Sequence, residues 1–377
     1  MPKFAQQKAL IIGGSLGGLF AAVSLRLIGW QVDVFERSSA EPYSRGGGIV
    51  LHREVLNALQ FFRITTGEPL GVRSHDRLVL NQPGEIISQQ SMPSTQTSWS
   101  VLYNALRRLI PDVNYHLGTR LVELSQKGNK VTAKFENGRT EIGDLLIGAD
   151  GASSTVRRLV LPGKWPSYSG YVAWRGLVPE SAVSGSANAQ IYENFALQQD
   201  PDSMMLVYMV PGADGSTKVG ERRFNWIWYL KANAGAELDA ILTDYKGQKH
   251  EYFVPPGSLA KSQELQIRKL GELRANPIFR ELICKTRDIF VQSIIDFSSP
   301  KMVFGRVLLT GDAAFVVRPH TASSTAKAAE NASKLAQNIL QSADLDRALN
   351  RWERQQLVAG AIMTDRGVRM GDRIMGR

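Results

Sequence analysis

The segment Ala9–Arg37 restricts the fold more than any other part of the sequence. An apolar run, Ala9–Gly13, ends in glycines, and Leu16–Ile28 then shows the periodicity of a helix. Gln31–Phe35 alternates and is apolar enough to form a second, parallel strand. A strand, a tight turn, a helix and a strand within about 30 residues predict an α/β fold that opens on a parallel sheet.

The turn carries the spacing of a dinucleotide-binding fingerprint. Gly13 would close the turn, and Gly18 would let the helix pack on the sheet. Ser15 replaces the usual middle glycine, and Leu16 opens the helix, whose first N–H groups would face a pyrophosphate. Glu36 follows about 20 residues later, where a carboxylate accepts hydrogen bonds from a ribose diol. We therefore predict cofactor contacts at these five residues; the alternative is a glycine turn with a surface carboxylate.

Composition sets further bounds. The 377 residues allow about two domains, and the absence of a run of about 18 apolar residues predicts no membrane span. The single cysteine, Cys284, excludes an internal disulfide and favours a cytoplasmic location. Its apolar, helical surroundings predict a small core residue. The histidines show no spacing typical of a metal site.

The formal net charge of +10 leaves two interpretations open. The basic residues are either a solvated surface or a means of attracting anions such as a phosphorylated cofactor or an acidic substrate. Arg347, Arg351 and Arg354 share one helical face, for which a solvated surface is the simpler interpretation. We find no nucleic-acid-binding module and expect no nucleic-acid partner.

The middle of the chain changes character. Between Tyr168 and Leu273, aromatic residues at short spacing alternate with glycine-marked turns, which predicts a β-rich domain. Val307–Thr310 then returns to a buried-strand pattern, and Ser323–Leu340 predicts a long helix. The other predicted elements are helices at Val55–Phe62 and Ser100–Leu109, a hairpin at Leu78–Gln90, and strands at Asn114–Leu124, Lys130–Phe135 and Arg139–Ile142. A nucleotide-binding domain is thus interrupted by a β-rich domain and then resumed.

Two further motifs identify the dinucleotide. Asp144–Arg157 reads DLLIGADGASSTVR, and Arg306–Ala314 reads RVLLTGDAA. Together with the glycine fingerprint, their order and spacing resemble the group A flavoprotein aromatic hydroxylases, over nearly the whole chain. That resemblance implies that Asp312 binds the ribityl and pyrophosphate region of FAD. It associates the motif around Asp150 with both FAD and NAD(P)H.

A narrower resemblance lies within this family. The segments YVAWRGLV, VPGADGST, NWIWY, VPPG and RPHTA begin at Tyr171, Val210, Asn225, Val254 and Arg318. They are similar to the 2,6-dihydroxypyridine 3-hydroxylase branch, which shares the Gly-Gly-Ser opening. The resemblance implies hydroxylation of an electron-rich ring, a hydroxypyridine or another N-heteroaromatic or a phenol. FAD, NADH or NADPH, and O2 would act through a flavin C4a-hydroperoxide.

The resemblance also implies a p-hydroxybenzoate hydroxylase-like fold. In it, a Rossmann-like FAD-binding domain is interrupted by a β-rich substrate domain. We expect residues 1–75, 96–165 and 285–377 to form the FAD-binding domain. Residues 76–95 and 166–284 would then form the substrate domain. No membrane span is expected, and a homodimer remains an open alternative to a monomer.

Further cofactor contacts follow from the resemblance. The family's Pro-x-x-Gly-Gln-Gly-x-Asn motif reads PHTASSTA here, from Pro319. Its residues Ala322, Ser323, Ser324 and Thr325 should begin a helix that faces the flavin, although the family usually has glycine at position 324. Trp99 replaces an arginine of many relatives, so a phosphate contact would be lost or supplied by Arg45. The remaining expected FAD contacts are Leu121, His52 and Arg37, the last of which either stacks on adenine or is only exposed.

The catalytic candidates are less constrained. His52 follows a glycine-rich segment that runs beside the flavin in the family, and its ordinary pKa of about 6.5 suits a general base. A packing or FAD-contact role fits it equally. His320 is either an active-site residue or a loop support. Tyr208 and Tyr229 either roof the substrate or fill the core.

Other functions compete with hydroxylation. A flavin reductase or dehydrogenase would share the FAD site without transferring oxygen, and a non-enzymatic FAD-binding protein would share it without turnover. A flavin halogenase is disfavoured, because Tyr229 and Leu230 follow the Trp226-x-Trp228 pair and the expected proline is missing.

Overall fold

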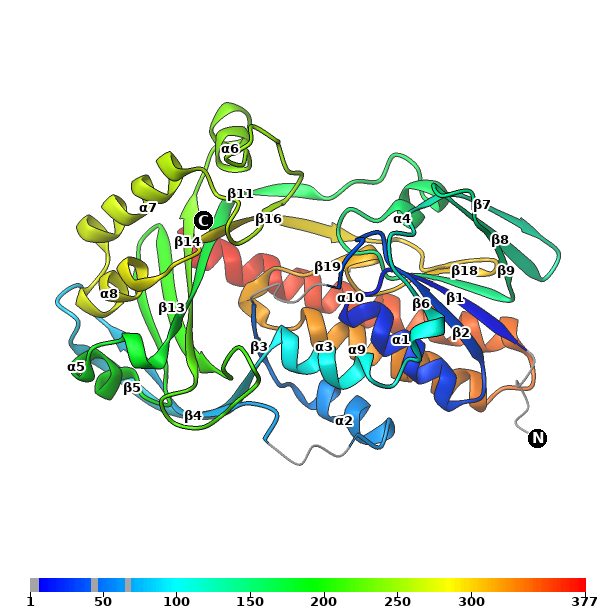
Figure 1. Ribbon diagram of the computed structural model, residues 1–377, viewed down its shortest axis with the longest axis horizontal. Coiled ribbons are helices and arrows are strands. Elements are labelled where there is room, and N and C mark those ends of the chain that lie inside the picture. Colours follow the sequence, from blue (N-terminus) through cyan, green and yellow to red (C-terminus); the bar gives the residue numbers. More distant parts are fainter. Residues whose placement is uncertain (1–6, 42–46, 65–68) are drawn as a thin grey trace.

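The computed structural model describes residues 7–41, 47–64 and 69–377. Its nucleotide-type sheet lies at the right of Figure 1 and is parallel apart from one edge pairing. In spatial order its strands are β17 (Val303–Phe304), β18 (Val307–Leu309), β10 (Leu145–Gly148), β1 (Lys8–Ile12), β2 (Gln31–Phe35) and β6 (Tyr115–His116). A small antiparallel sheet of β7 (Leu121–Lys127), β8 (Lys130–Phe135) and β9 (Thr140–Gly143) lies beside it.

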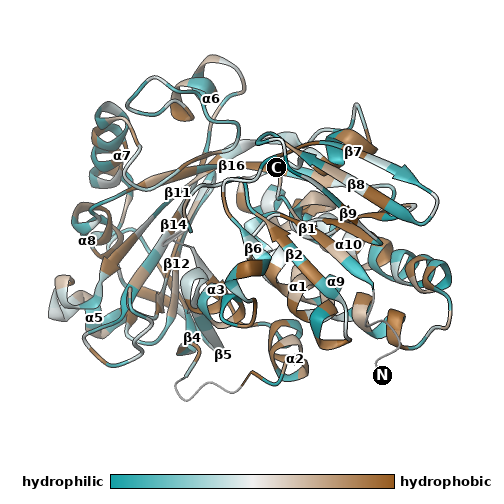
Figure 2. Cartoon of the chain, turned by 45° about the vertical axis from the view of Figure 1, so that its right-hand side comes forward, coloured by the Kyte–Doolittle hydropathy of each residue, from teal (hydrophilic) through white to brown (hydrophobic). Residues whose placement is uncertain are grey.

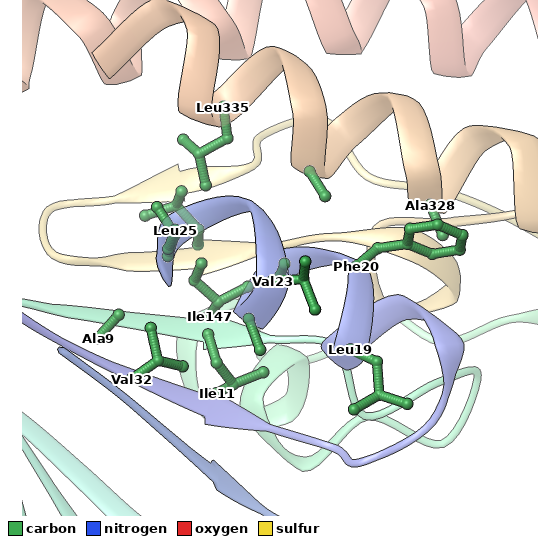
Figure 3. Packing of buried hydrophobic residues seen from close by; sticks show 14 of the residues in the cluster. Ala9, Ile11, Leu19, Phe20, Val23, Leu25, Val32, Ile147, Ala328 and Leu335 are labelled. Carbon is green, nitrogen blue, oxygen red and sulfur yellow. The ribbon is translucent and has the colours of Figure 1, made fainter. Parts of the chain in front are cut away.

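Helix α1 (Leu16–Leu27) is sandwiched between the parallel strands and α9 (Ser324–Leu340). Figure 3 shows Phe20 of α1 reaching toward Ala328 of α9, with Ile11 and Ile147 of the strands on the other side. These side chains are buried, and the burial of apolar surface stabilises the layer that positions the glycine turn.

The second sheet is large and mixed, and it lies at the left of Figure 1. Its strands in order are β15 (Phe253–Val254), β16 (Phe290–Ser298), β11 (Ser167–Pro179), β14 (Arg223–Lys231), β13 (Ser203–Val210), β12 (Phe195–Asp200), β4 (Val72–Leu80), β5 (Ile86–Ser98) and β3 (Gly48–Val50), and β19 (Phe315–Val316) pairs with β16. Helices α7 (Lys261–Arg274) and α8 (Pro277–Lys285) cover one face, where Trp226 and Trp228 are buried. The opposite face of this large sheet is turned toward the part of the molecule that contains the parallel sheet. Figure 2 shows hydrophobic stretches along β11 and β16 and a mostly hydrophilic α7.

Helix α10 (Leu345–Ile374) runs from one sheet to the other. At its start, the fully buried Trp352 donates a hydrogen bond from Nε1 to the Asn331 carbonyl in α9, at 2.9 Å. Beyond its end, Arg377 donates to the Ser169 carbonyl on β11, also at 2.9 Å. The helix therefore links the two parts of the molecule. The remaining helices are α2 (Arg53–Phe61), α3 (Trp99–Arg107), α4 (Thr155–Val160), α5 (Gly185–Ile191) and α6 (Ala236–Ile241), with short 3-10 turns at Asp112–Asn114, Glu180–Ala182, Gly311–Ala313 and Pro319–Thr321.

The structure confirms the predicted α/β architecture with a β-rich second part. Two local predictions are wrong. The strand expected at Asn114–Leu124 is split into β6 and β7, because Gly118 turns the chain with a φ of 61°. Cys284 is exposed rather than part of the core, since it lies on the outward side of α8, whose inward side is formed by Leu282 and Ile283.

Arg347, Arg351 and Arg354 are exposed on α10, as predicted for a solvated face. Within the described ranges, no helix is both long and apolar enough to span a membrane. The same residues contain no cluster of side chains suited to hold a metal ion.

Candidate functional site

The glycine turn after β1 leaves no room for a side chain at Gly13 or at Gly18. Gly13 has a φ of 107°, and an added Cβ would lie 2.5 Å from the Ala149 carbonyl oxygen of the neighbouring strand end. A Cβ on Gly18 would lie only 1.8 Å from the Gly13 carbonyl oxygen. The backbone of α1 therefore packs directly against the backbone at the ends of β1 and β10. The free N–H groups at the start of α1 lie directly at this turn, where an anion is stabilised.

Ser15 is the N-cap of α1, and Leu16 is its first residue. In the described part of the chain, the Ser15 side chain makes no capping hydrogen bond to the helix. The hydroxyl is therefore available to a ligand at the turn.

Glu36 is fixed at the end of β2. Its side chain is buried, and it accepts hydrogen bonds from the backbone N–H of Gly14 at 2.8 Å and of Ser38 at 2.9 Å. Each carboxylate oxygen keeps a free lone pair, since an ionised carboxylate offers about four acceptor sites. The side chain is thus held in place while it can still accept bonds from a ligand.

A cavity of about 220 Å³ opens over these residues. Seven of the predicted cofactor contacts line it: Gly13, Ser15, Glu36, Arg37, Leu121, Asp150 and Asp312. Leu16 and Gly18 belong to the first turn of α1 and are not in the lining of this cavity. Backbone donors at one side and carboxylates at the other fit the pyrophosphate and ribose of a dinucleotide.

Asp150 lies at the edge of this cavity and caps helix α4. Its carboxylate accepts hydrogen bonds from the Ser154 hydroxyl and from the backbone N–H of Thr155 and Val156, the last at 3.0 Å. Desolvation raises the pKa of Asp150. The side chain orders the segment after the second motif, a role that the sequence alone does not reveal.

Asp312 is held by α9. Its Oδ1 accepts hydrogen bonds from the Ser324 hydroxyl at 3.1 Å and from the Lys327 ammonium at 2.9 Å. Lys327 is 1% exposed and also donates to the Phe315 carbonyl. Lys327 was not predicted from the sequence; the available signal was a lysine within the run of small residues from Ser324 to Ala329.

The start of α9 has an unusual backbone. Ala322 has a φ of 53°, in the left-handed region, at the position where the family motif has glycine. Ser323 precedes the helix, Ser324 contacts Asp312, and Thr325 is the second helical residue. Of the four residues predicted to face the flavin, Ser324 contacts Asp312, and the lining of the described cavity contains none of the four.

Other predicted contacts lie further away. Trp99, at the start of α3, stacks on Tyr103 with ring centroids 4.6 Å apart, and its backbone N–H donates to the Gly47 carbonyl. His52 is the N-cap of α2, and in the described chain its buried Nε2 has no hydrogen-bond partner. Arg45 lies outside the described residues.

Of the catalytic candidates, Tyr208 lies on β13 of the large sheet, and His320 lies in the turn before α9 and packs against that sheet. His320 Nε2 lies 2.7 Å from the Tyr171 hydroxyl, and its ring makes an edge contact with Tyr229 at 4.2 Å. Burial, together with the charge of Arg318, lowers the pKa of His320 to about 3, so the ring is neutral. Burial raises the pKa of Tyr208, whose ring stacks on Phe195.

Comparisons with known proteins agree with this geometry. Residues 168–296 match a family model described as FAD binding domain-like. The chain is 33% identical over 364 residues to 2,6-dihydroxypyridine 3-monooxygenase of Paenarthrobacter nicotinovorans, covering 97% of this chain and 90% of the relative. It is 26% identical over 342 residues to 6-hydroxynicotinate 3-monooxygenase of Pseudomonas fluorescens, covering 86% of this chain and 80% of the relative.

A comparison with solved structures also points to a 2,6-dihydroxypyridine hydroxylase as a similar protein. The structure of 2,6-dihydroxypyridine-3-hydroxylase from Arthrobacter nicotinovorans matches with a TM-score of 0.93 at 32% identity, covering 98% of this chain and 93% of the other. Fold and cavity thus define an FAD-binding oxidoreductase. The chain belongs to the group A FAD-dependent aromatic hydroxylases, flavoprotein monooxygenases that use FAD with NADH or NADPH as co-substrate.

Proposed function

We propose that this monooxygenase hydroxylates an electron-rich N-heteroaromatic ring of the hydroxypyridine kind. The observation that carries the proposal is the 33% identity over 97% of the chain to an enzyme named for 2,6-dihydroxypyridine. A second relative is named for 6-hydroxynicotinate, which is also a hydroxylated pyridine. When bound, FAD would take two electrons from NADH or NADPH, transfer one atom of O2 to the ring and release the other as water.

The proposed placement of FAD follows the cavity. The first N–H groups of α1 and the Ser15 hydroxyl would hold the pyrophosphate, and Glu36 would accept bonds from the ribose. Asp312 would use the oxygen not bound by Lys327 to accept a bond from the ribityl chain. The N–H groups at the start of α9 would stabilise negative charge on the flavin ring.

The substrate would lie between this flavin and the facing side of the large sheet. His320 and Tyr208 present side chains to that region, and His52 has an unpartnered ring nitrogen among the described residues. We propose these residues as substrate or flavin contacts. We further propose the domain division 1–75, 96–165 and 285–377 against 76–95 and 166–284. With these bounds the FAD-binding domain contributes β3, β16 and the outer ends of β4 and β5 to the large sheet. A homodimer and a cytoplasmic location stay predictions.

A ring panel tests the proposed substrate class. Protein saturated with FAD is mixed with NADH or NADPH and with hydroxypyridines, phenols and unsubstituted pyridines, and nicotinamide oxidation and product mass are followed. We expect hydroxypyridines to accelerate oxidation and to gain one oxygen atom. Faster turnover with phenols than with hydroxypyridines would show that phenols are the substrate class. Oxidation without an oxygenated product from any ring would favour a reductase.

A further inference from the structure

The inward face of the large sheet carries an arginine without a carboxylate partner. Arg175 lies on β11 and is half-buried. Among the described residues its Nε has no hydrogen-bond partner, and no ion pair joins its guanidinium to an aspartate or glutamate. An arginine stays charged at all physiological pH values. A buried N–H group without an acceptor is costly, and a bound anion beside the guanidinium would remove that cost.

Strand register places other polar groups on the same face. Arg175 lies opposite Ile227, and Tyr208 lies opposite Asn225, so β11, β13 and β14 present these side chains together. Tyr229 follows on the same side of β14. The other face carries the tryptophans packed under α7 and α8. The polar groups thus gather where the sheet faces the proposed flavin position.

The backbone of Gly47 and Gly48 packs against these polar side chains. A Cβ on Gly47 would lie 3.3 Å from Arg175 Nη2, and one on Gly48 would lie 2.4 Å from the Tyr208 ring. The Gly48 N–H donates to Asn225 Oδ1 at 3.2 Å. That bond fixes the amide orientation, and Asn225 Nδ2 is left buried without a partner in the described chain.

The hydrogen bonds of His320 determine which of its nitrogens carries the proton. Arg318, in bonds with Asp296 and Asp372, also donates from Nη1 to the Tyr171 oxygen at 3.4 Å. The Tyr171 hydroxyl hydrogen is then free to point at His320 Nε2, 2.7 Å away. A neutral ring that accepts at Nε2 carries its hydrogen on Nδ1. Nδ1 is the buried ring nitrogen that lacks a partner among the described residues.

We propose that Arg175, Asn225 and His320 form a binding site for an anionic aromatic substrate, which enters already deprotonated at a ring hydroxyl. In the described chain, the unpartnered nitrogens of these residues are all hydrogen-bond donors, and one belongs to a cation. An acceptor-rich, negatively charged group matches such a set of donors best, because it can accept from all three and offset the guanidinium charge. The inference rests on the proposed function and names the ionic form of its substrate.

A substrate that enters with its ring hydroxyl already deprotonated does not need a general base of the protein to remove that proton. The titratable groups facing Arg175 are Tyr208 from β13, Tyr229 from β14 and Tyr171 from β11, with His320 from the loop before α9. Burial raises the pKa of each tyrosine, and the pKa of His320 is lowered to about 3.

The other neighbours of Arg175 do not titrate. Phe290 and Gln292 face it from β16 and Gly47 from the chain before β3, and none of these side chains ionises. Behind His320, Arg318 is paired with Asp296 and Asp372. The affinity of the site should therefore follow the ionisation of the ligand rather than that of the protein.

The test titrates oxidised holoenzyme, without NADH or NADPH, by the perturbation of its FAD absorption. The probes are 2,6-dihydroxypyridine and its dimethyl ether, which cannot ionise, at pH values across the ionisation of the hydroxyl. We expect the affinity of the wild type for the dihydroxypyridine to rise with pH and then level off. Arg175→Met should weaken anion binding by at least about tenfold and flatten that rise. Ether binding should stay unchanged.

Two further variants keep the test decisive if Arg175→Met does not fold. Arg175→Lys keeps the charge but loses the guanidinium geometry, so it should retain part of the pH dependence. Asn225→Asp keeps the acceptor for Gly48 but turns a carboxylate oxygen toward the ligand, and it should weaken anion binding by a similar factor. Arg73→Met, an exposed change on β4 of the same sheet, is the matched control and should bind both probes like the wild type.

The outcomes separate the two proposals. If the wild type hydroxylates the ring but its affinity is independent of pH, or if Arg175→Met and Asn225→Asp bind the anion normally, the anion site is wrong. If the anion binds as described but no ring is hydroxylated, the site stands and the proposed function fails.

Discussion

Replacing Gly18 by alanine places a methyl group where the structure has no space for one. The added Cβ would lie 1.8 Å from the Gly13 carbonyl oxygen and 3.3 Å from Ile11 Cγ2. Carbon–oxygen contacts are normally about 3.3 Å or longer, so α1 must move by roughly 1.5 Å. The closest obstacle is the Gly13 carbonyl group, which is backbone, so rotamer changes cannot relieve the clash. The movement carries the first N–H groups of α1 away from the turn.

The neighbouring Gly17 supplies a matched control. A Cβ there would lie 3.9 Å from the Cβ atoms of Ala149 and Ala328, an ordinary van der Waals contact. Alanine is favoured over glycine in a helix by up to about 1 kcal/mol, so Gly17→Ala should leave stability unchanged or slightly raised. Gly18→Ala receives the same helical benefit, but overpacking costs typically about 1–3 kcal/mol and more against rigid backbone. We expect a net loss of about 3 kcal/mol for Gly18→Ala.

Thermal unfolding and FAD titration measure both consequences. The apoprotein of Gly18→Ala should melt several degrees below the wild type, and it should bind FAD at least about tenfold more weakly, because the displaced helix end no longer meets the pyrophosphate. Gly17→Ala should match the wild type in both assays. If the two variants behave alike, the packing argument for the glycine turn is refuted.

Three further predictions concern α9 and the buried ion pairs. Ala322→Gly should raise stability by about 1 kcal/mol in thermal unfolding, because φ is 53° there, and a loss would contradict the left-handed backbone. Lys327→Met should weaken FAD binding about tenfold by freeing Asp312, and unchanged FAD affinity would show that the pair is unconnected with the cofactor. Burial alone would raise the pKa of Glu180, but hydrogen bonds from Arg222 lower it below the ordinary 4.5. This ion pair therefore stabilises the fold above the ordinary carboxyl range and loses its contribution as the pH falls below it. Glu180→Gln should cost about 3 kcal/mol at neutral pH and reduce the acid sensitivity measured by denaturant unfolding; a variant as stable as the wild type at neutral pH would contradict this.

Local periodicity explains what the sequence could predict of the fold. The opening unit, with α1, α3 and α9, follows from residues within one helix or turn of each other. The order of the large sheet does not, because its pairings are long-range. Strand β12, for example, pairs in parallel with β4, and Phe195 lies opposite Arg77. No local pattern encodes a contact between residues so far apart in the chain.

Some residues of the candidate site could also be predicted from the sequence, and others could not. Gly13 and Glu36 were predictable because their spacing marks the ends of two parallel strands, and Asp312 was predicted from the resemblance of its motif to the family. The three residues line one cavity. Lys327 and Arg175 were not, since the meaning of a buried charge depends on neighbours that only the fold brings close. A lysine or arginine in a sequence is otherwise assigned to the surface.

Oxygen transfer is the central claim, and labelled dioxygen tests it most directly. FAD-loaded protein is supplied with 2,6-dihydroxypyridine, NADH or NADPH, and isotopically labelled O2, and the product is weighed by mass spectrometry. Family membership and the FAD cavity predict one labelled oxygen atom in the ring for each nicotinamide oxidised. Nicotinamide oxidation that yields only peroxide and an unchanged ring, across the hydroxypyridines, would contradict the claim.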